Sequence, residues 1–422
     1  MSALEQRALA AIDMTALIDT LGELIAMPSD QGSELAIQQR MGELLDGMDM
    51  RTDVWEIDLD STREHPSYGA EIERERALGV LGRWGGDQGP SLILNGHVDV
   101  VPAGELERWS VPPFAATQRD DRIYGRGAVD MKGGLCCAIE AVRAIQRAGL
   151  TLDGSVMIQP VVGEEDGGLG TLAAILRGHR ADAAIVLEPT EMAIAPAQAG
   201  ALSFRITVPG LAAHGALRAE GVDPMDYFQR IHLALRKLET ERNQRMNHPL
   251  FVDYAIPFAI CVGKIQAGIW ASTVAEALVL EGRYGVGIGE DLDRARSELE
   301  AAVAETAIGD EWLQAHPPLV EWWGARFEPA AIPADHALVS ILGSAFAEAT
   351  GNVAPVRGMP YGADMHLLIN QAGIPAVLFG PGDVRVAHAP DEFVPIADLE
   401  AVTRTLVLSI LRFCGAQDRD VG

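Results

Sequence analysis

Short apolar runs alternate with amphipathic stretches along the first half of this chain, and this alternation constrains its fold more than any other feature. The runs that indicate buried strands cover residues 77–83, 91–95, 155–162 and 183–187. The stretches with the apolar spacing of helices cover residues 13–28, 33–47, 132–148 and 169–178. Because strands and helices alternate, we expect an α/β domain with a mostly parallel sheet and helices on both faces.

The pattern changes near Ala199, where a strand, a helix, two strands, a helix and a last strand follow in turn. Their predicted ranges are 201–209, 223–243, 257–266, 277–286, 290–306 and 318–328. That order is the split βαβ arrangement of a small α+β (ferredoxin-like) domain. The α/β pattern then returns with predicted elements at 335–350, 377–380 and 396–413. We therefore predict one α/β domain, residues 1–198 and 330–422, that is interrupted by an inserted domain, residues 199–329.

The chain is acidic and lacks the marks of a secreted or membrane protein. Its 422 residues carry a formal net charge of −27, which disfavours binding to nucleic acid phosphates and anionic lipid. No apolar run is long enough to span a membrane, and the N-terminal segment has the pattern of an amphipathic helix instead of a signal peptide. Four cysteines in a chain of this length do not indicate a disulfide framework. We therefore expect a cytoplasmic protein without a nucleic acid or membrane partner.

Seven ionisable side chains share one placement in this pattern. Each follows a predicted strand or lies in a loop rich in glycine or proline beside one: His97, Asp99, Asp130, Glu164, Glu165, Glu188 and His388. In open parallel sheets ligands bind beyond the carboxyl ends of the strands, so we expect these side chains to converge there. Taken singly, His97 can be a loop histidine, Asp130 a helix cap and the two glutamates a solvated acidic loop. Their joint occurrence favours a metal site.

The side-chain types narrow the metal. Imidazoles and carboxylates without a thiolate form a nitrogen and oxygen site, which suits zinc, cobalt, manganese or iron. A carboxylate such as that of Asp130 can bridge two ions about 3.5–4 Å apart. Because Glu164 and Glu165 are adjacent and point in different directions, one can bind metal while the other faces a substrate.

Five motifs follow one another in a fixed order: H-x-D at 97–99, D-x-K-G-G at 130–134, E-E at 164–165, E-P-T at 188–190, and the late His388. In this order they resemble the dinuclear metallohydrolase family of acetylornithine deacetylase, succinyl-diaminopimelate desuccinylase, aminoacylase and glutamate carboxypeptidase. The resemblance covers nearly the whole chain and implies two divalent metal ions, with zinc as the first choice and cobalt or manganese as alternatives.

The resemblance also implies a role for each residue of the predicted metal site. His97 and Glu188 would bind one ion, Glu165 and His388 the other, and Asp130 would bridge the two. Glu164 would be the general base and Asp99 would orient His97. The peptide bond after Asp130 would be cis.

The inserted domain resembles the lid and dimerisation domain of the same family. His214 matches a histidine that reaches the active site of a partner subunit, so we expect a homodimer in which His214 stabilises the oxyanion. Arg283 matches an arginine that holds a substrate carboxylate. Without the resemblance, His214 would be a surface loop histidine and Arg283 an exposed strand arginine. Gly380 is predicted to shape the substrate pocket together with Asp364.

The resemblance implies an amidohydrolase of the deacetylase or desuccinylase type, acting on a small molecule. Its expected reaction is hydrolysis of the amide C–N bond of an N-acylated amino acid or a related compound. Glu188 in the E-P-T motif is typical of the deacylating branch. The alternatives are a dipeptidase or carboxypeptidase, and a deformylase or aminohydrolase that acts on a non-peptide amine. Ser272 stands where many relatives have asparagine, which leaves the substrate open.

Overall fold

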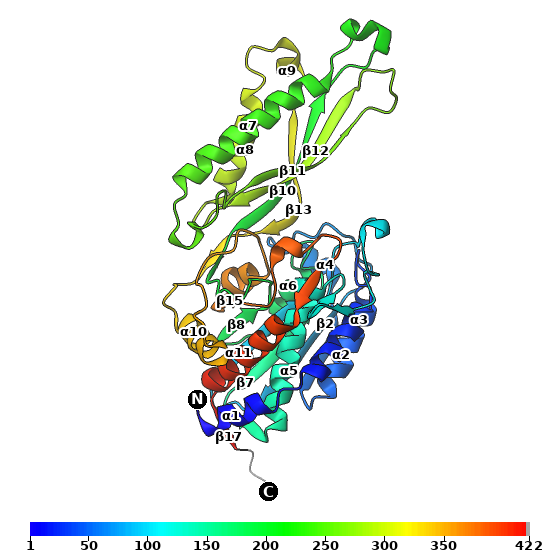
Figure 1. Cartoon of the computed structure of the whole chain (residues 1–422). Helices are drawn as coiled ribbons and strands as arrows, with labels where there is room; N and C mark the ends of the chain where they lie inside the picture. Colours follow the sequence, from blue (N-terminus) through cyan, green and yellow to red (C-terminus); the bar gives the residue numbers. More distant parts are fainter. Residues whose placement is uncertain (419–422) are drawn as a thin grey trace. The chain divides into compact units, whose positions relative to one another are not determined.

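The computed structural model describes residues 1–418, and the chain divides into two compact units (Figure 1). As far as it is described, the first unit comprises residues 1–197, 331–358 and 363–418, and the second comprises residues 198–330 and 359–362. The last four residues of the predicted range 330–422 lie outside the described residues.

A six-stranded sheet forms the centre of the first unit. Its strands are β1 (Arg51–Glu56), β2 (Leu78–Gly85), β3 (Ser91–His97), β7 (Ser155–Val161), β8 (Ala183–Val186) and β15 (Ala376–Leu378). They lie in the order β1-β2-β7-β3-β8-β15. The pairs β7–β3, β3–β8 and β8–β15 are parallel, whereas β1–β2 and β2–β7 are antiparallel. The prediction of a mostly parallel sheet is confirmed.

Helices cover both faces of this sheet. The chain passes from β3 through α5 (Gly133–Arg147) to β7, and from β7 through α6 (Leu169–Leu176) to β8. Because β7 and β8 lie on opposite sides of β3, the two crossovers run in opposite directions. Right-handed crossovers then place α5 and α6 on opposite faces. α11 (Ile396–Cys414) packs beside α5, and α10 (Ala337–Thr350) packs beside α11 (Figure 1).

Among residues 1–418, four further helices and several short strands lie outside the two main sheets. The helices are α1 (Ala3–Ala10), α2 (Met14–Ile25), α3 (Leu35–Asp46) and α4 (Leu59–Arg63). The strands are β4 (Thr117–Arg119), β5 (Arg122–Tyr124), β6 (Leu150–Leu152), β9 (Ala197–Gln198), β14 (Ala330–Ala331), β16 (Phe393–Pro395) and β17 (Ala416–Asp418). Among the helical turns, Ala128–Lys132 directly precedes α5, and its Asp130–Met131 peptide bond is cis, as the resemblance implies.

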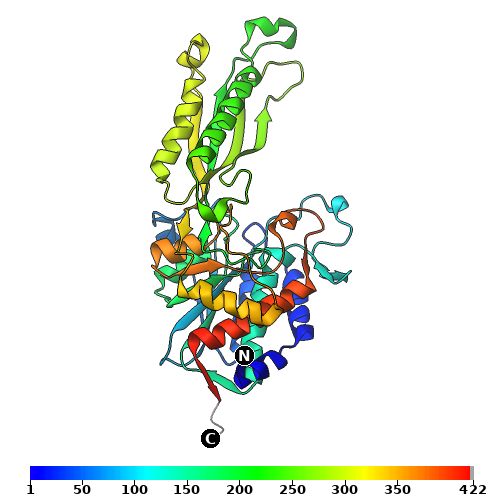
Figure 2. The same ribbon diagram turned by 60° about the vertical axis from the view of Figure 1, so that its left-hand side comes forward.

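The second unit is an antiparallel sheet with two long helices. Its elements are β10 (Gly200–Pro209), α7 (Pro224–Arg245), β11 (Ile260–Ala267), β12 (Ala277–Val286), α8 (Leu292–Glu305), α9 (Glu311–Ala315) and β13 (Leu319–Phe327). The strands lie in the order β11-β12-β10-β13. α7 and α8 lie side by side along the sheet (Figure 2), and apolar side chains such as Phe204, Ile231 and Leu280 fill the space beneath them. The element order and the antiparallel sheet confirm the predicted α+β fold.

A short segment of the late chain packs with the second unit. Met359–Gly362 lies inside the predicted range 330–422, but the main-chain nitrogen of Ala199 donates to the carbonyl of Met359 at 2.8 Å. A Cβ on Gly362 would lie 2.3 Å from Cβ of Phe327, so this glycine permits the close approach of the segment to β13.

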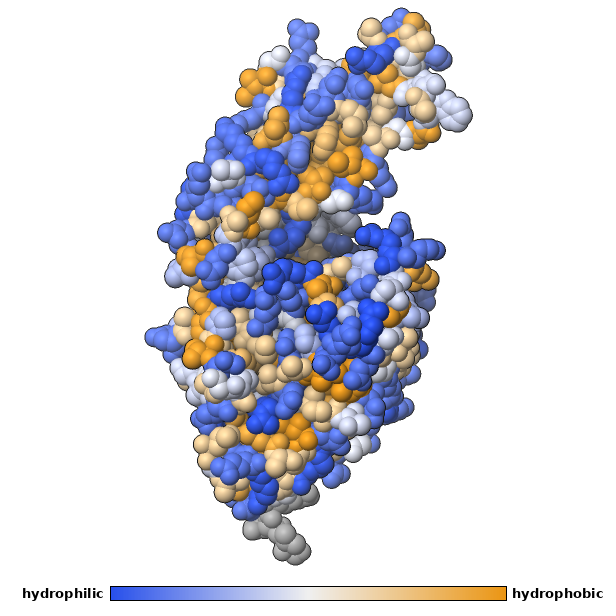
Figure 3. All heavy atoms as spheres, in the orientation of Figure 1, coloured by the Kyte–Doolittle hydropathy of each residue, from blue (hydrophilic) through white to orange (hydrophobic). Residues whose placement is uncertain are grey.

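Hydrophilic residues cover most of the face shown in Figure 3. On the face shown in Figure 3, hydrophobic residues occur in small groups among hydrophilic ones in both units. No helix within residues 1–418 combines the length and apolar character needed to cross a bilayer.

Candidate metal centre

The carboxyl ends of three neighbouring parallel strands carry four of the predicted site residues. His97 is the last residue of β3, Glu164 and Glu165 lie in the loop after β7, and Glu188 lies in the loop after β8. Since β7, β3 and β8 are parallel and adjacent, these ends meet at one edge of the sheet.

Asp130 lies between the two predicted histidine ligands. Its Oδ1 is 3.1 Å from Nε2 of His97, and its Oδ2 is 3.4 Å from Nε2 of His388. The same nitrogen of His388 is 3.0 Å from Oε2 of Glu165. A carboxylate that directs one oxygen to each of two imidazoles has the placement that a bridging ligand requires.

Two groups of side chains could each hold one ion. His97, Glu164 and Glu188 form one group, and His97, Asp130 and Glu165 form the other; within each group the donor atoms lie within 4.8 Å of one another. The structure therefore brings all the predicted ligands except His388 into these groups, and His388 contacts Asp130 and Glu165 directly. The division of the ligands between two ions stays a prediction.

Four carboxyl groups in this space repel one another. Burial and the charge of Glu188 raise the pKa of Glu164 well above its ordinary value, and burial and the charge of Asp130 raise the pKa values of Glu188 and Glu165. Although burial opposes it, hydrogen bonds to Asp130 and Glu165 raise the pKa of His388 to about 11. The cluster thus attracts positive charge, which divalent cations could supply. The nitrogen and oxygen donors fit zinc, cobalt or manganese.

Asp99 supports two of these residues. Its main-chain carbonyl is 2.8 Å from Nδ1 of His97, whereas its nearer carboxylate oxygen is 3.8 Å from that nitrogen. Its Oδ2 accepts a hydrogen bond from the main-chain nitrogen of Glu165 at 3.0 Å. The closest contact to His97 is therefore made by the backbone of Asp99, while its carboxylate holds the loop after β7.

Glu392, which is not among the residues predicted from the sequence, holds the turn that presents Asp130. Its Oε1 accepts hydrogen bonds from the main-chain nitrogens of Val129 and Asp130 at 3.0 and 3.2 Å. Its Oε2 is 2.6 Å from Nη1 of Arg126, and its side chain is buried. The one signal in the sequence is the acidic pair that follows His388 in the segment AHAPDE.

Asp364 lies at the end of a buried chain of hydrogen bonds. Thr171 donates from Oγ1 to Oδ2 of Asp364 at 2.5 Å, and Asn95, two residues before His97, donates from Nδ2 to Oγ1 of Thr171 at 2.9 Å. Burial raises the pKa of Asp364 to about 7. This network links Asp364 to Asn95 on β3, and the role of Asp364 in shaping a substrate pocket stays a prediction.

Close packing around Gly380 leaves no space for a side chain at this position. A Cβ at this position would lie 2.4 Å from the carbonyl oxygen of Leu187 and 2.5 Å from that of Glu188. Its main-chain nitrogen is also within 3.2 Å of Oγ1 of Thr190. The residue thus lets the chain after β15 approach the chain after β8, and its predicted contact with substrate remains untested.

His214 and Arg283 both lie in the second unit. His214 is exposed, and its Nδ1 accepts a hydrogen bond from the main-chain nitrogen of Ala216 at 3.1 Å. In the neutral imidazole this leaves the proton on Nε2, which can act as a donor. Arg283 on β12 is half-buried and donates from Nη2 to the carbonyl of Pro360 at 2.9 Å. Their contribution to the metal centre stays a prediction.

Sequence comparisons point to one family of hydrolases. A model of peptidase family M20/M25/M40 matches residues 93–412. The N-formyl-4-amino-5-aminomethyl-2-methylpyrimidine deformylase of Bacillus subtilis is 30% identical over 342 residues, which cover 77% of this chain and 79% of that protein. An acetylornithine deacetylase of Yersinia pestis is 28% identical over 404 residues, which cover 94% of this chain and 97% of that protein.

Solved structures share the fold at lower sequence identity. A di-peptidase from Saccharomyces cerevisiae has a TM-score of 0.78 and 14% identity, with 98% of this chain and 99% of that chain covered. Human carnosine dipeptidase 1 has a TM-score of 0.76 and 14% identity, with 97% and 99% covered.

Proposed function

Because this chain belongs to peptidase family M20/M25/M40, we propose that it hydrolyses the amide C–N bond of a small N-acylated amine with Glu164 as the general base. The family membership makes the chain a metal-dependent hydrolase, and the two divalent cations are proposed to be zinc, with cobalt or manganese as alternatives. His97, Asp130, Glu165, Glu188 and His388 would hold them. Bound there, the cations would polarise the substrate carbonyl and lower the pKa of a water molecule.

The different surroundings of the two adjacent glutamates carry this proposal. The carboxylate of Glu165 is paired with His388, and its main-chain nitrogen is held by Asp99. The carboxylate of Glu164 makes no hydrogen bond within the described part of the chain, and Nε2 of His97 lies 4.0 Å from its Oε2. Glu165 therefore suits a ligand, whereas Glu164 is free to exchange a proton.

The chemistry of Glu164 fits a group that both accepts and returns a proton. Burial and the charge of Glu188 raise the pKa of Glu164, so this carboxylate binds a proton more strongly than an exposed glutamate does. Glu164 takes a proton from the attacking water and passes it to the nitrogen of the leaving amine. His214, with Nε2 as donor, stabilises the developing oxyanion from the partner subunit of a homodimer.

The substrate class is inferred from two observations. Glu188 stands in the E-P-T motif, and an acetylornithine deacetylase matches nearly the full chain, so we propose a deacylase. Removal of a formyl group from a non-peptide amine is the second candidate, because the matched deformylase is 30% identical. Both reactions use the same base and differ in the acyl group and the amine.

Glu164→Gln tests the proposal. The purified chain, loaded with zinc, cobalt or manganese, should hydrolyse a member of a panel of N-acetyl, N-succinyl and N-formyl amines and dipeptides. Glu164→Gln should then lower kcat by about 10²–10⁴-fold, the usual contribution of a general base, while metal content per chain stays at the wild-type level. The exposed Glu64 provides the control, since Glu64→Gln should leave kcat unchanged. Full activity in Glu164→Gln would exclude Glu164 as the base, and loss of metal together with activity would make it a ligand.

A further inference from the structure

Arg74 uses all five of its N–H donors in the interior of the first unit. Its side chain is 2% exposed. Nη1 and Nη2 donate to the two oxygens of Asp166, each at 2.9 Å, and Nη2 and Nε donate to Oε1 of Glu34 at 2.6 and 3.2 Å. Nη1 also reaches the carbonyl of Ile72 at 3.3 Å. The planar guanidinium thus joins three separate segments of the chain.

Asp166 connects this cluster to the loop that carries Glu164. Besides its two bonds to Arg74, its Oδ2 accepts a hydrogen bond from the main-chain nitrogen of Ile72 at 2.9 Å. Its carbonyl accepts another from the nitrogen of Glu71 at 3.1 Å. Both the side chain and the main chain of Asp166 are therefore fixed to residues 71–74.

The loop itself is closed by short main-chain hydrogen bonds. The nitrogen of Gly168 donates to the carbonyl of Gly163 at 2.7 Å, and the nitrogen of Gly167 donates to the carbonyl of Glu164 at 2.9 Å. A Cβ on Gly163 would lie 3.2 Å from Cζ of Arg74, so the loop is in direct contact with the guanidinium. Displacement of Asp166 would consequently move the main chain of Glu164.

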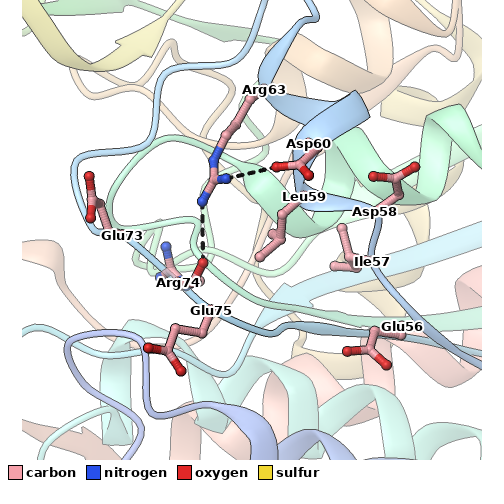
Figure 4. A pocket seen from close by; sticks show the side chains of 9 residues that line it. All are labelled: Glu56, Ile57, Asp58, Leu59, Asp60, Arg63, Glu73, Arg74 and Glu75. Atoms are coloured by element: carbon pink, nitrogen blue, oxygen red, sulfur yellow. Dashed lines mark hydrogen bonds and ion pairs between the residues drawn. The ribbon is translucent and has the colours of Figure 1, made fainter.

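The segment around Arg74 is also held from its outer side. Figure 4 shows a pocket of about 800 Å³ whose lining is mostly acidic, with Arg63 extending from Asp60 to the backbone of Arg74. Nη1 of Arg63 is 3.1 Å from Oδ1 of Asp60, and its Nη2 donates to the carbonyl of Arg74 at 3.3 Å. The segment therefore has contacts on both sides and gives Asp166 a fixed support.

We propose that Arg74 is a positioning residue for the reaction: through Asp166 it fixes the main chain from which Glu164 projects. This inference rests on the proposed function, because it concerns the base of that reaction. A displacement of about 1 Å in a reacting group can lower a rate by about 10²-fold, so a clamp on this loop affects turnover as well as folding. Lysine would keep the charge but lose the bidentate contact with Asp166.

The test compares Arg74→Lys and Asp166→Asn with Arg76→Lys. Arg76 lies two residues away and pairs with Glu56 on the surface. Arg76→Lys is therefore the same substitution at a residue whose ion pair is not with the loop that carries Glu164. Assays are made at saturating metal and below the unfolding temperature of every variant. Arg74→Lys and Asp166→Asn should lower kcat by about tenfold or more with KM and metal content near wild type. Arg76→Lys should change neither kcat nor KM.

A second background separates positioning from general stability. With Glu164→Gln already present, Arg74→Lys should lower the remaining kcat little further, because the group that it positions is absent. An equal fall in both backgrounds would overturn the proposal, as would wild-type kcat in both Arg74→Lys and Asp166→Asn. If Arg74→Lys does not fold, the kcat of the isosteric variant Asp166→Asn in the two backgrounds tests the proposal instead. Wild-type kcat in Glu164→Gln alone would instead refute the proposed function.

Discussion

Arg283 differs from a neighbouring arginine of the same sheet in having no carboxylate partner within residues 1–418. Its one hydrogen bond goes to the carbonyl of Pro360, and burial lowers the pKa of its guanidinium. On the adjacent strand, Nη2 of Arg205 is 2.7 Å from Oε1 of Glu281. A guanidinium that is removed from water without a counter-ion gains most from an anion that arrives with a ligand.

Arg283→Ala should therefore discriminate between substrates. For an N-acyl amino acid the variant should raise KM by about 10–100-fold, the loss expected for a charged hydrogen bond, with a smaller change in kcat. For the matched N-acyl amine without a carboxylate, KM should stay near wild type. Steady-state kinetics on both substrates measure these KM values. Arg205→Ala is the control, because Arg205 already has a carboxylate partner in Glu281. Equal losses on the two substrates would show that Arg283 does not bind a carboxylate.

For single residues, the sequence predicted which side chains converge better than it predicted their supporting contacts. The convergence of His97, Glu164 and Glu188 was predictable because each follows an apolar strand, and parallel strands end at one edge. The contact of Glu392 with the nitrogen of Asp130 spans 262 positions, and that of Arg74 with Asp166 spans 92. Such pairs depend on the tertiary fold and have no local pattern that would reveal them.

At the scale of elements, two loops of the second unit form one structure. The main-chain nitrogen of Gly215 donates to the carbonyl of Ser272 at 2.7 Å, and the nitrogen of Val274 donates to the carbonyl of Ala213 at 2.9 Å. His214 lies between these contacts and pairs with Thr273. The backbone position of His214 is thus set by the loop before β12, which contains Ser272.

Gly215→Ala should disturb this loop pair and, through it, the reaction. The added Cβ would lie 2.9 Å from the carbonyl oxygen of Ser272, closer than side chains tolerate, so the loops must separate. We expect kcat to fall by about tenfold, which corresponds to a barrier increase of about 1.4 kcal/mol, without loss of bound metal. Gly263→Ala on β11 is the matched control, because no atom lies within 4 Å of the Cβ that it would add. An unchanged kcat in Gly215→Ala would show that the position of His214 does not affect the reaction rate.

Element types followed from periodicity, and the exceptions have a physical reason. The predicted helix 223–243 and the observed α7 (Pro224–Arg245) differ by one residue at the start and two at the end. β1 (Arg51–Glu56) has no predicted counterpart, because RTDVWE contains only two apolar residues and lies at the edge of its sheet. An edge strand needs fewer buried side chains than a central one, so its pattern is weak.

At the scale of the whole molecule, the residues of the proposed reaction are divided between two units with separate sheets. The first unit holds the candidate metal ligands and Glu164, and the second holds His214 and Arg283. Such a division was expected from the sequence because the element order changes from α/β to split βαβ. The attachment of Met359–Gly362 to the second unit could not be predicted, because four residues are too few to show the apolar periodicity of a helix or strand. The proposed homodimer makes each site dependent on a second copy of the chain.

Subunit mixing tests this dependence. His214→Ala and Glu164→Gln chains are expressed together with different tags, and the mixed dimers are purified through both. Each variant alone should lose about 10²-fold or more in kcat. In the mixed dimer, one site combines the intact Glu164 of one chain with the intact His214 of its partner, so about half of the wild-type activity per dimer should return. Mixed dimers as inactive as their parents would place both residues of each site in one chain. A monomer by light scattering under assay conditions would exclude a shared site directly.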